Sequence, residues 1–226
     1  MGFMADSSTR PVIPQPHQQV FLDAARVFLA LAERIEPEQF DRPGLGVWTV
    51  HELLGHTSRA ITTVETYLTA NVDSAPGAGS LPDAEVTVPD AETYYREVFA
   101  TYTDHAAVAR RGAEAAARLG DDPAAVIAAD LARTELLLRQ QHPTATITIG
   151  TMTLPLEQYL RTRTFELVVH GLDLARATGL NLEMPLPIVA DTAALAARVA
   201  VSRGSGREVL FALTGRDSLP GGFSIF

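Results

Sequence analysis

The chain has 226 residues, of which 46% are hydrophobic, so it can bury a sizeable core and should form one larger domain with room for a small appendage. Its formal net charge of −9 excludes the excess of Lys and Arg that a nucleic-acid-binding surface requires. It contains no cysteine, which excludes disulfides, thiolate metal ligands and a cysteine nucleophile, so a metal would be held by imidazole and carboxylate groups and thiol chemistry would need an external thiol.

The sequence carries no signal for a membrane or for export. Residues 1–10 are polar, and no apolar run approaches the roughly 20 residues that span a bilayer. Met1-Gly2 is not followed by a myristoylation signal, because Asp6 stands where that signal has Ser or Thr. We therefore expect a cytoplasmic protein whose partners include neither a membrane nor nucleic acid.

The first predicted elements are a tail and two helices. Residues 1–15 lack periodicity and are predicted to form a flexible tail. Apolar residues at three- and four-residue spacings then predict a helix that ends at Glu36-Pro37. The second helix begins at Thr49, because the sequence TVHE (residues 49–52) is a capping box, and its apolar stripe predicts about five turns packed inward.

The middle of the chain is predicted to contain a long loop and two further helices. Residues 71–89 are rich in Gly, Pro, Ser and Asp, and both a lid and simple disorder remain open for them. A third helix should open at Asp90 and run toward Leu119, and another should start at Asp122-Pro123.

The last third is predicted to complete the bundle and add a small domain. Residues 144–153 alternate in the manner of a strand, and a long helix should follow over residues 154–178. Beyond a proline-containing linker we expect a helix over about 188–203 and a short apolar run over 207–214. The predicted organisation is a helical bundle over residues 16–182 and a small α/β C-terminal domain over residues 183–226.

Glu166 and His170 are the most informative pair for function. They lie four residues apart on a predicted helix, about 40° apart around its axis, so they can share one ion. A catalytic zinc site has three nitrogen or oxygen ligands and an open position. His56 flanks the inward stripe of the second helix, whereas His51 falls about 140° away around the same helix and cannot easily reach the same metal.

These residues also admit other interpretations. The sequence HELLGH (residues 51–56) has one residue too many for the zinc-protease motif HExxH, so we reject a protease. Metal-assisted hydrolysis needs a general base beside the metal, for which the sequence offers no clear candidate. On spacing alone, a surface Glu–His pair and a hydrogen-bonded core histidine are the commoner explanations.

Two blocks of sequence favour a metal site over these alternatives. WTVHELLGH (residues 48–56) and RTFELVVHGLDLA (residues 163–175) resemble the mycothiol-dependent maleylpyruvate isomerase family of the wider DinB-like superfamily, in register with each other. The resemblance covers roughly residues 15–180. It implies a mainly α fold, a DinB-like four-helix bundle with a small C-terminal α/β appendage, and it places His56, Glu166 and His170 at the positions of the metal ligands.

The resemblance also implies a chemistry. The expected ion is zinc, although nickel or another divalent ion could replace it, and the open position would receive a low-molecular-weight thiol, with mycothiol expected. A coordinated thiol is deprotonated, so it would attack a small electrophilic substrate, either by S-transfer or by reversible addition that gives cis–trans isomerisation. A non-catalytic bundle that binds metal or ligand is the alternative.

Three more residues have expected roles at this site. The sequence ALTGR (residues 212–216) resembles the family's closing segment, in which an arginine reaches the active site, so Arg216 is the expected catalytic residue that binds a carboxylate. A solvated arginine in a turn is the alternative. Asp173 would orient the imidazole of His170, unless it is simply an exposed helical aspartate, and Arg163 would pair with Glu166.

Overall fold

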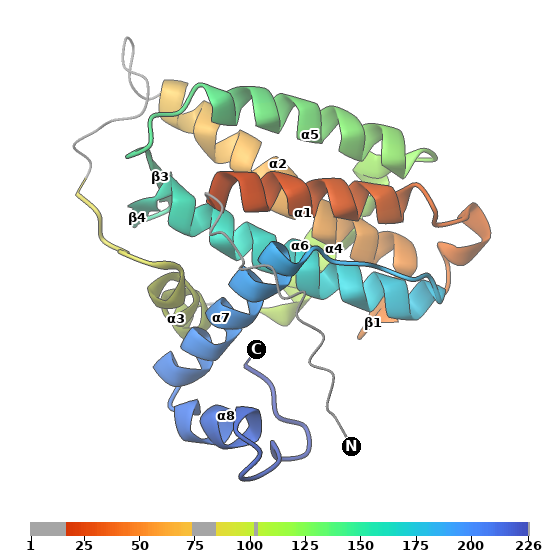
Figure 1. Ribbon diagram of the computed structural model, residues 1–226. Coiled ribbons are helices and arrows are strands. Elements are labelled where there is room, and N and C mark those ends of the chain that lie inside the picture. Colours follow the sequence, from red (N-terminus) through yellow and green to blue (C-terminus); the bar gives the residue numbers. More distant parts are fainter. Residues whose placement is uncertain (1–16, 74–84, 102–103, 226) are drawn as a thin grey trace, which may run out of the picture.

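The computed structural model describes residues 17–73, 85–101 and 104–225, so the predicted tail and most of the predicted 71–89 loop lie outside the described residues. The described part is mainly helical, with two small antiparallel hairpins (Figure 1). The helices are α1 (His17–Ala32), α2 (Val50–Asp73), α3 (Ala91–Thr101), α4 (His105–Leu119), α5 (Pro123–Arg139), α6 (Leu156–Thr178), α7 (Leu186–Ser202) and α8 (Gly206–Leu213). The remaining elements are a short 3-10 helix, η1 (Pro37–Gln39), and the strands β1 (Pro43–Leu45), β2 (Trp48–Thr49), β3 (Thr146–Ile149) and β4 (Met152–Pro155).

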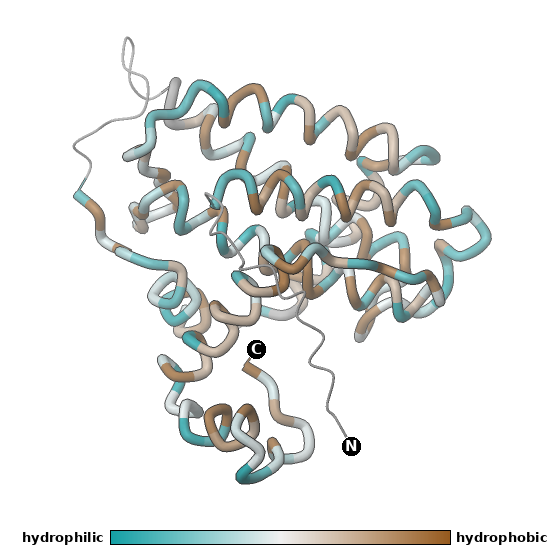
Figure 2. The backbone as a smooth tube through the Cα atoms, in the orientation of Figure 1, coloured by the Kyte–Doolittle hydropathy of each residue, from teal (hydrophilic) through white to brown (hydrophobic). Residues whose placement is uncertain are grey.

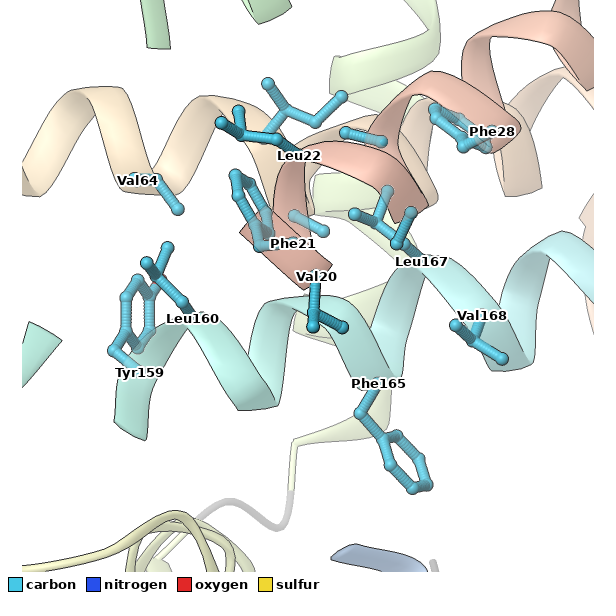
Figure 3. Packing of buried hydrophobic residues seen from close by; sticks show 14 of the residues in the cluster. Val20, Phe21, Leu22, Phe28, Val64, Tyr159, Leu160, Phe165, Leu167 and Val168 are labelled. Atoms are coloured by element: carbon cyan, nitrogen blue, oxygen red, sulfur yellow. The ribbon is translucent and has the colours of Figure 1, made fainter. Parts of the chain in front are cut away.

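Four long helices, α1, α2, α5 and α6, pack lengthwise around the main core, and α4 lies against α2 (Figure 1). Figure 3 shows Phe21 of α1 among Val64 of α2 and Leu160 and Leu167 of α6, with Phe28 further along α1. Both phenylalanines are fully buried, as expected for the apolar face of an inward-facing helix. The predicted mainly α four-helix bundle is confirmed.

The start of α2 is built as its sequence predicts. The amide of Glu52 donates to the Thr49 hydroxyl at 3.2 Å, and the amide of Thr49 donates to the Glu52 carboxylate at 2.9 Å. This capping box satisfies backbone donors that an open helix end would leave unpaired. The helix then runs further than expected, to Asp73, so residues 71–73 are helical and not part of the loop.

The predicted helix over residues 90–119 is wrong, because the structure divides it in two. Helix α3 ends at Thr101, and Asp104 begins α4 by accepting a hydrogen bond from the amide of Ala107 at 2.8 Å. An aspartate that caps the amides of the following turn marks a helix start, and the continuous alanine-rich pattern conceals it in the sequence.

The single strand predicted over residues 144–153 is instead a hairpin, because this range contains β3, a turn at residues 150–151 and the first two residues of β4. Leu154 pairs with Ile147 and Pro155 with Thr146, so α6 begins two residues later than expected, at Leu156. Pro155 is the extended residue before the first turn of α6, and its ring holds φ at a value that suits this position.

The C-terminal segment is helical in its described part. Helix α7 packs on α6 and α3, and α8 packs on α7 (Figure 1). The apolar run over residues 207–214, expected to give this region its β character, forms α8, and residues 183–225 contain no strand. A short apolar run fits a helix and a strand equally well by periodicity, which is why the sequence misleads here. Figure 2 shows that both α7 and α8 carry hydrophobic stretches.

Gly55 allows α2 and α4 to approach each other closely. A Cβ on Gly55 would lie 2.7 Å from the Cα of Ala116, which is backbone and cannot turn aside. We expect Gly55→Ala to lower the free energy of unfolding by about 1–3 kcal/mol, because overpacking outweighs the gain in helix propensity. Urea unfolding measures this, with Gly221→Ala as the control, since a Cβ there meets nothing within 4 Å. Equal losses in the two variants would contradict the close contact.

Candidate metal centre

Helices α2 and α6 bring His56, Glu166 and His170 together. One possible ligand atom from each residue lies within 4.8 Å of the others. The rings of His56 and His170 meet edge to face with centroids 5.0 Å apart, and the Glu166 carboxylate lies 3.4 Å from Nε2 of His170. All three side chains are partly exposed, so the cluster is accessible from outside the bundle.

Neighbouring side chains hold Glu166 and His170 in place. The Asp173 carboxylate lies 3.2 Å from Nδ1 of His170, which leaves Nε2 turned toward Glu166. The hydroxyl of Tyr95, a buried residue of α3, donates to the Glu166 carboxylate at 3.1 Å. A carboxylate behind an imidazole fixes the orientation of the ring and raises its basicity, which is the usual arrangement around a metal-binding histidine.

His56 is positioned by the indole of Trp48. The two rings stack with centroids 4.3 Å apart, and the indole N–H donates to the carbonyl oxygen of Ala109 in α4 at 3.3 Å. Nδ1 of His56 is buried and has no hydrogen-bond partner among the described residues. A buried polar atom without a partner is costly, so this nitrogen is an indication that the site accepts something the protein itself does not supply.

The three ionisable groups have strongly shifted pKa values. Burial, reinforced by the charge of His170, lowers the pKa of His56 to about 4. Burial also acts to lower the pKa of His170. The hydrogen bonds to Asp173 and Glu166 outweigh burial and raise this pKa to about 9. Burial would raise the pKa of Glu166, yet the hydrogen bond to His170 and the charge of Arg163 lower it to about 2. Without a metal at neutral pH, His56 is neutral and Glu166 and His170 form an ion pair.

These features fit a divalent metal ion. Two imidazoles and one carboxylate are a recognised set of zinc ligands that leaves a position open. His56 contributes a neutral ring with a partnerless nitrogen, and Glu166 contributes an ionised oxygen. His170 presents Nε2, with Asp173 behind the ring, and must release its proton to bind.

The other residues singled out from the sequence lie in different surroundings. His51 stacks on Phe40 at 4.9 Å and is not part of the cluster, as the helix geometry predicts. Arg163 does not form the expected ion pair with Glu166 in the described structure; its guanidinium lies over the Tyr159 ring at 4.9 Å, and its Nε donates to the Thr162 hydroxyl at 3.1 Å.

Arg216 is exposed just beyond α8, where its guanidinium donates to the carbonyl of Thr214. Within the described part of the chain no hydrogen bond or ion pair joins it to the three clustered residues. Its role as the catalytic arginine therefore stays a prediction.

Tyr95 contacts the cluster through Glu166, and the sequence does not reveal this contact. It belongs to no motif, and its contact with Glu166 depends on how α3 packs against α6. The sequence signal it does carry is that of any buried aromatic residue on a helix face.

The contact between Asp173 and His170 gives a test. We expect Asp173→Asn to weaken zinc binding by roughly 10- to 100-fold, the usual cost of losing the group behind a metal-binding histidine. The matched control is Glu157→Gln, which removes the same charge from an exposed position on α6. Competition with a chelating dye measures both affinities. Equal affinities in the two variants would remove Asp173 from the site.

Comparison with known proteins gives one match. Residues 21–175, more than half of the chain, match the family described as the mycothiol maleylpyruvate isomerase N-terminal domain. No curated protein and no solved structure shows significant similarity to the chain. None of the described helices combines the length and the apolar character needed to span a bilayer.

Proposed function

The chain belongs to the mycothiol maleylpyruvate isomerase N-terminal domain family, and on that premise we propose that it is a metal-dependent enzyme that activates a low-molecular-weight thiol. His56, Glu166 and His170 hold a divalent ion, with zinc the expected one and mycothiol the expected thiol. The reaction is S-transfer to a small electrophile or its cis–trans isomerisation. The observation that carries the proposal is the meeting of three possible ligand atoms within 4.8 Å, from two helices that pack side by side.

The protein's contribution is to orient its ligands and adjust their protonation. Asp173 fixes the ring of His170, Tyr95 holds the Glu166 carboxylate, and Trp48 sets the ring plane of His56. When bound, the metal ion supplies the positive charge that turns a thiol into a thiolate at neutral pH. Three protein ligands leave a position for the sulfur atom.

In both reactions the bonds formed and broken balance without a further reagent. In S-transfer the thiolate forms a C–S bond, and the displaced electron pair leaves with a leaving group or takes up a proton. In isomerisation the thiolate adds to one carbon of a cis double bond, the resulting single bond rotates, and the thiolate is expelled as the trans double bond forms. The first reaction consumes the thiol, and the second returns it.

The experiment mixes zinc-loaded protein with mycothiol and an electrophile. Monobromobimane tests S-transfer through the loss of free thiol, and maleylpyruvate tests isomerisation through the change in its ultraviolet absorption at constant thiol. We expect one of the two reactions to run faster than its uncatalysed rate, and protein stripped of metal to add nothing to that rate. A protein that binds one metal ion per chain but turns over neither substrate with any thiol would support the non-catalytic alternative.

A further inference from the structure

Helices α2 and α6 run antiparallel, which places two arginines at the same level beside the metal centre. His56 meets His170 with ring centroids 5.0 Å apart, and further along α2 the Thr63 hydroxyl accepts a hydrogen bond from Tyr159 at 3.0 Å. Between these two contacts lie Arg59, three residues after His56, and Arg163, three residues before Glu166. Each arginine therefore lies about 4.5 Å along its helix axis from a predicted metal ligand. Both are displaced in the same direction, toward the contact between Thr63 and Tyr159.

Neither guanidinium group forms an ion pair with a carboxylate among the described residues. In the described part of the chain, no carboxylate lies within ion-pair distance of Arg59 or Arg163, whereas Arg161, close by on α6, contacts both Glu92 and Asp191. Burial and the charge of Arg111 lower the pKa of Arg59, so positive charges gather here. Burial opposes the charge of Arg163, but the neighbouring Tyr159, Tyr94 and Glu166 raise its pKa. At Arg59 burial dominates, and a partly buried cation that no carboxylate contacts is stabilised when a ligand supplies an anion.

Arg163 is held rigidly while its terminal nitrogens remain available. Its guanidinium lies 4.9 Å from the ring centroid of Tyr159 and 6.0 Å from that of Tyr94. Among the described residues its one hydrogen bond runs from Nε to the Thr162 hydroxyl. Arg163 and Arg59 are both partly exposed. A guanidinium stacked on aromatic rings presents its planar edge, which is the edge that binds the two oxygens of a carboxylate.

We propose that Arg59 and Arg163 bind a carboxylate group of the small molecule that reacts at the metal centre. This proposal rests on the proposed function and assigns two residues of this chain, one on each helix, to the binding of a substrate carboxylate. It gives these two residues the role that the family resemblance implied for Arg216. A carboxylate held here leaves the adjoining carbon atoms of the ligand about one helical turn from the metal ligands.

The test measures binding, independently of turnover. Isothermal titration of zinc-loaded protein uses succinate, an unreactive dicarboxylate, and its uncharged dimethyl ester. We expect wild-type protein to prefer succinate, and Arg59→Gln and Arg163→Gln each to weaken succinate binding by at least about tenfold, the usual size of one charged hydrogen bond. Arg176→Gln, which removes the same charge from an exposed position on α6, should leave the affinity unchanged.

Several outcomes would overturn the proposal. These are the absence of a succinate preference in wild-type protein, unchanged succinate affinity in the arginine variants, and tighter binding of inorganic phosphate than of succinate. Metal content and circular dichroism are checked first, and Arg59→Gln decides alone if Arg163→Gln does not fold. Arginine-dependent succinate binding without thiol turnover would refute only the proposed function, and turnover with arginine-independent binding would refute only this inference.

Discussion

Replacing His56, Glu166 or His170 by alanine should weaken zinc binding by more than about 100-fold. Loss of a group that merely orients a ligand costs 10- to 100-fold, and loss of one of three ligands costs more. The three possible ligand atoms lie within 4.8 Å of one another, so each is expected to contact the same ion. Elemental mass spectrometry of the purified variants and chelator competition measure the effect.

The matched control is His142→Ala, which removes an exposed histidine whose Nδ1 contacts Thr144, outside the cluster. Circular dichroism must show a folded bundle, because Glu166 and His170 support each other as an ion pair in the metal-free protein. A folded variant that retains wild-type zinc affinity would exclude the substituted residue from the ligand set.

Apparent zinc affinity should rise about tenfold per pH unit between pH 6 and pH 8. The pKa of His170 is raised to about 9, so below that pH a proton competes with zinc for its nitrogen. Glu166, with a pKa of about 2, is already ionised in this range, and His56, with a pKa of about 4, is already neutral. One proton, that of His170, must therefore leave for each zinc ion bound.

Calorimetry at pH 7.5 in buffers of different ionisation enthalpy counts the released protons directly. We expect about one per zinc ion. An ordinary histidine, with a pKa of 6.5, would be mostly deprotonated at this pH and would release almost none. An affinity that stays flat from pH 7 to pH 8, or zinc binding without proton release, would contradict the ion pair between Glu166 and His170.

The predictions that rest on local geometry agree with the structure. The capping box at Thr49 and Glu52 forms both of its hydrogen bonds, and the four-residue spacing of Glu166 and His170 puts them 3.4 Å apart on one helix face. Both follow from the geometry of a single helix, which the sequence determines directly.

The features that depend on packing between distant elements could not be predicted from spacing. The meeting of His56 with His170 requires the register of α2 against α6, which the family resemblance supplied and helix periodicity did not. The contact of Tyr95 with Glu166 and the juxtaposition of Arg59 with Arg163 depend on the same tertiary arrangement. The helix start at Asp104 and the helical state of α8 were missed because an alanine-rich pattern and a short apolar run each fit two structures.

The most direct test of a thiol-activating metal centre is the absorption spectrum of protein loaded with cobalt in place of zinc. Mycothiol added to this protein should produce an intense near-ultraviolet band from sulfur bound to cobalt, saturating at one thiol per metal ion and absent from the Glu166→Ala and His170→Ala variants. A protein that binds cobalt at His56, Glu166 and His170 but whose spectrum does not respond to mycothiol or any other thiol would contradict the account.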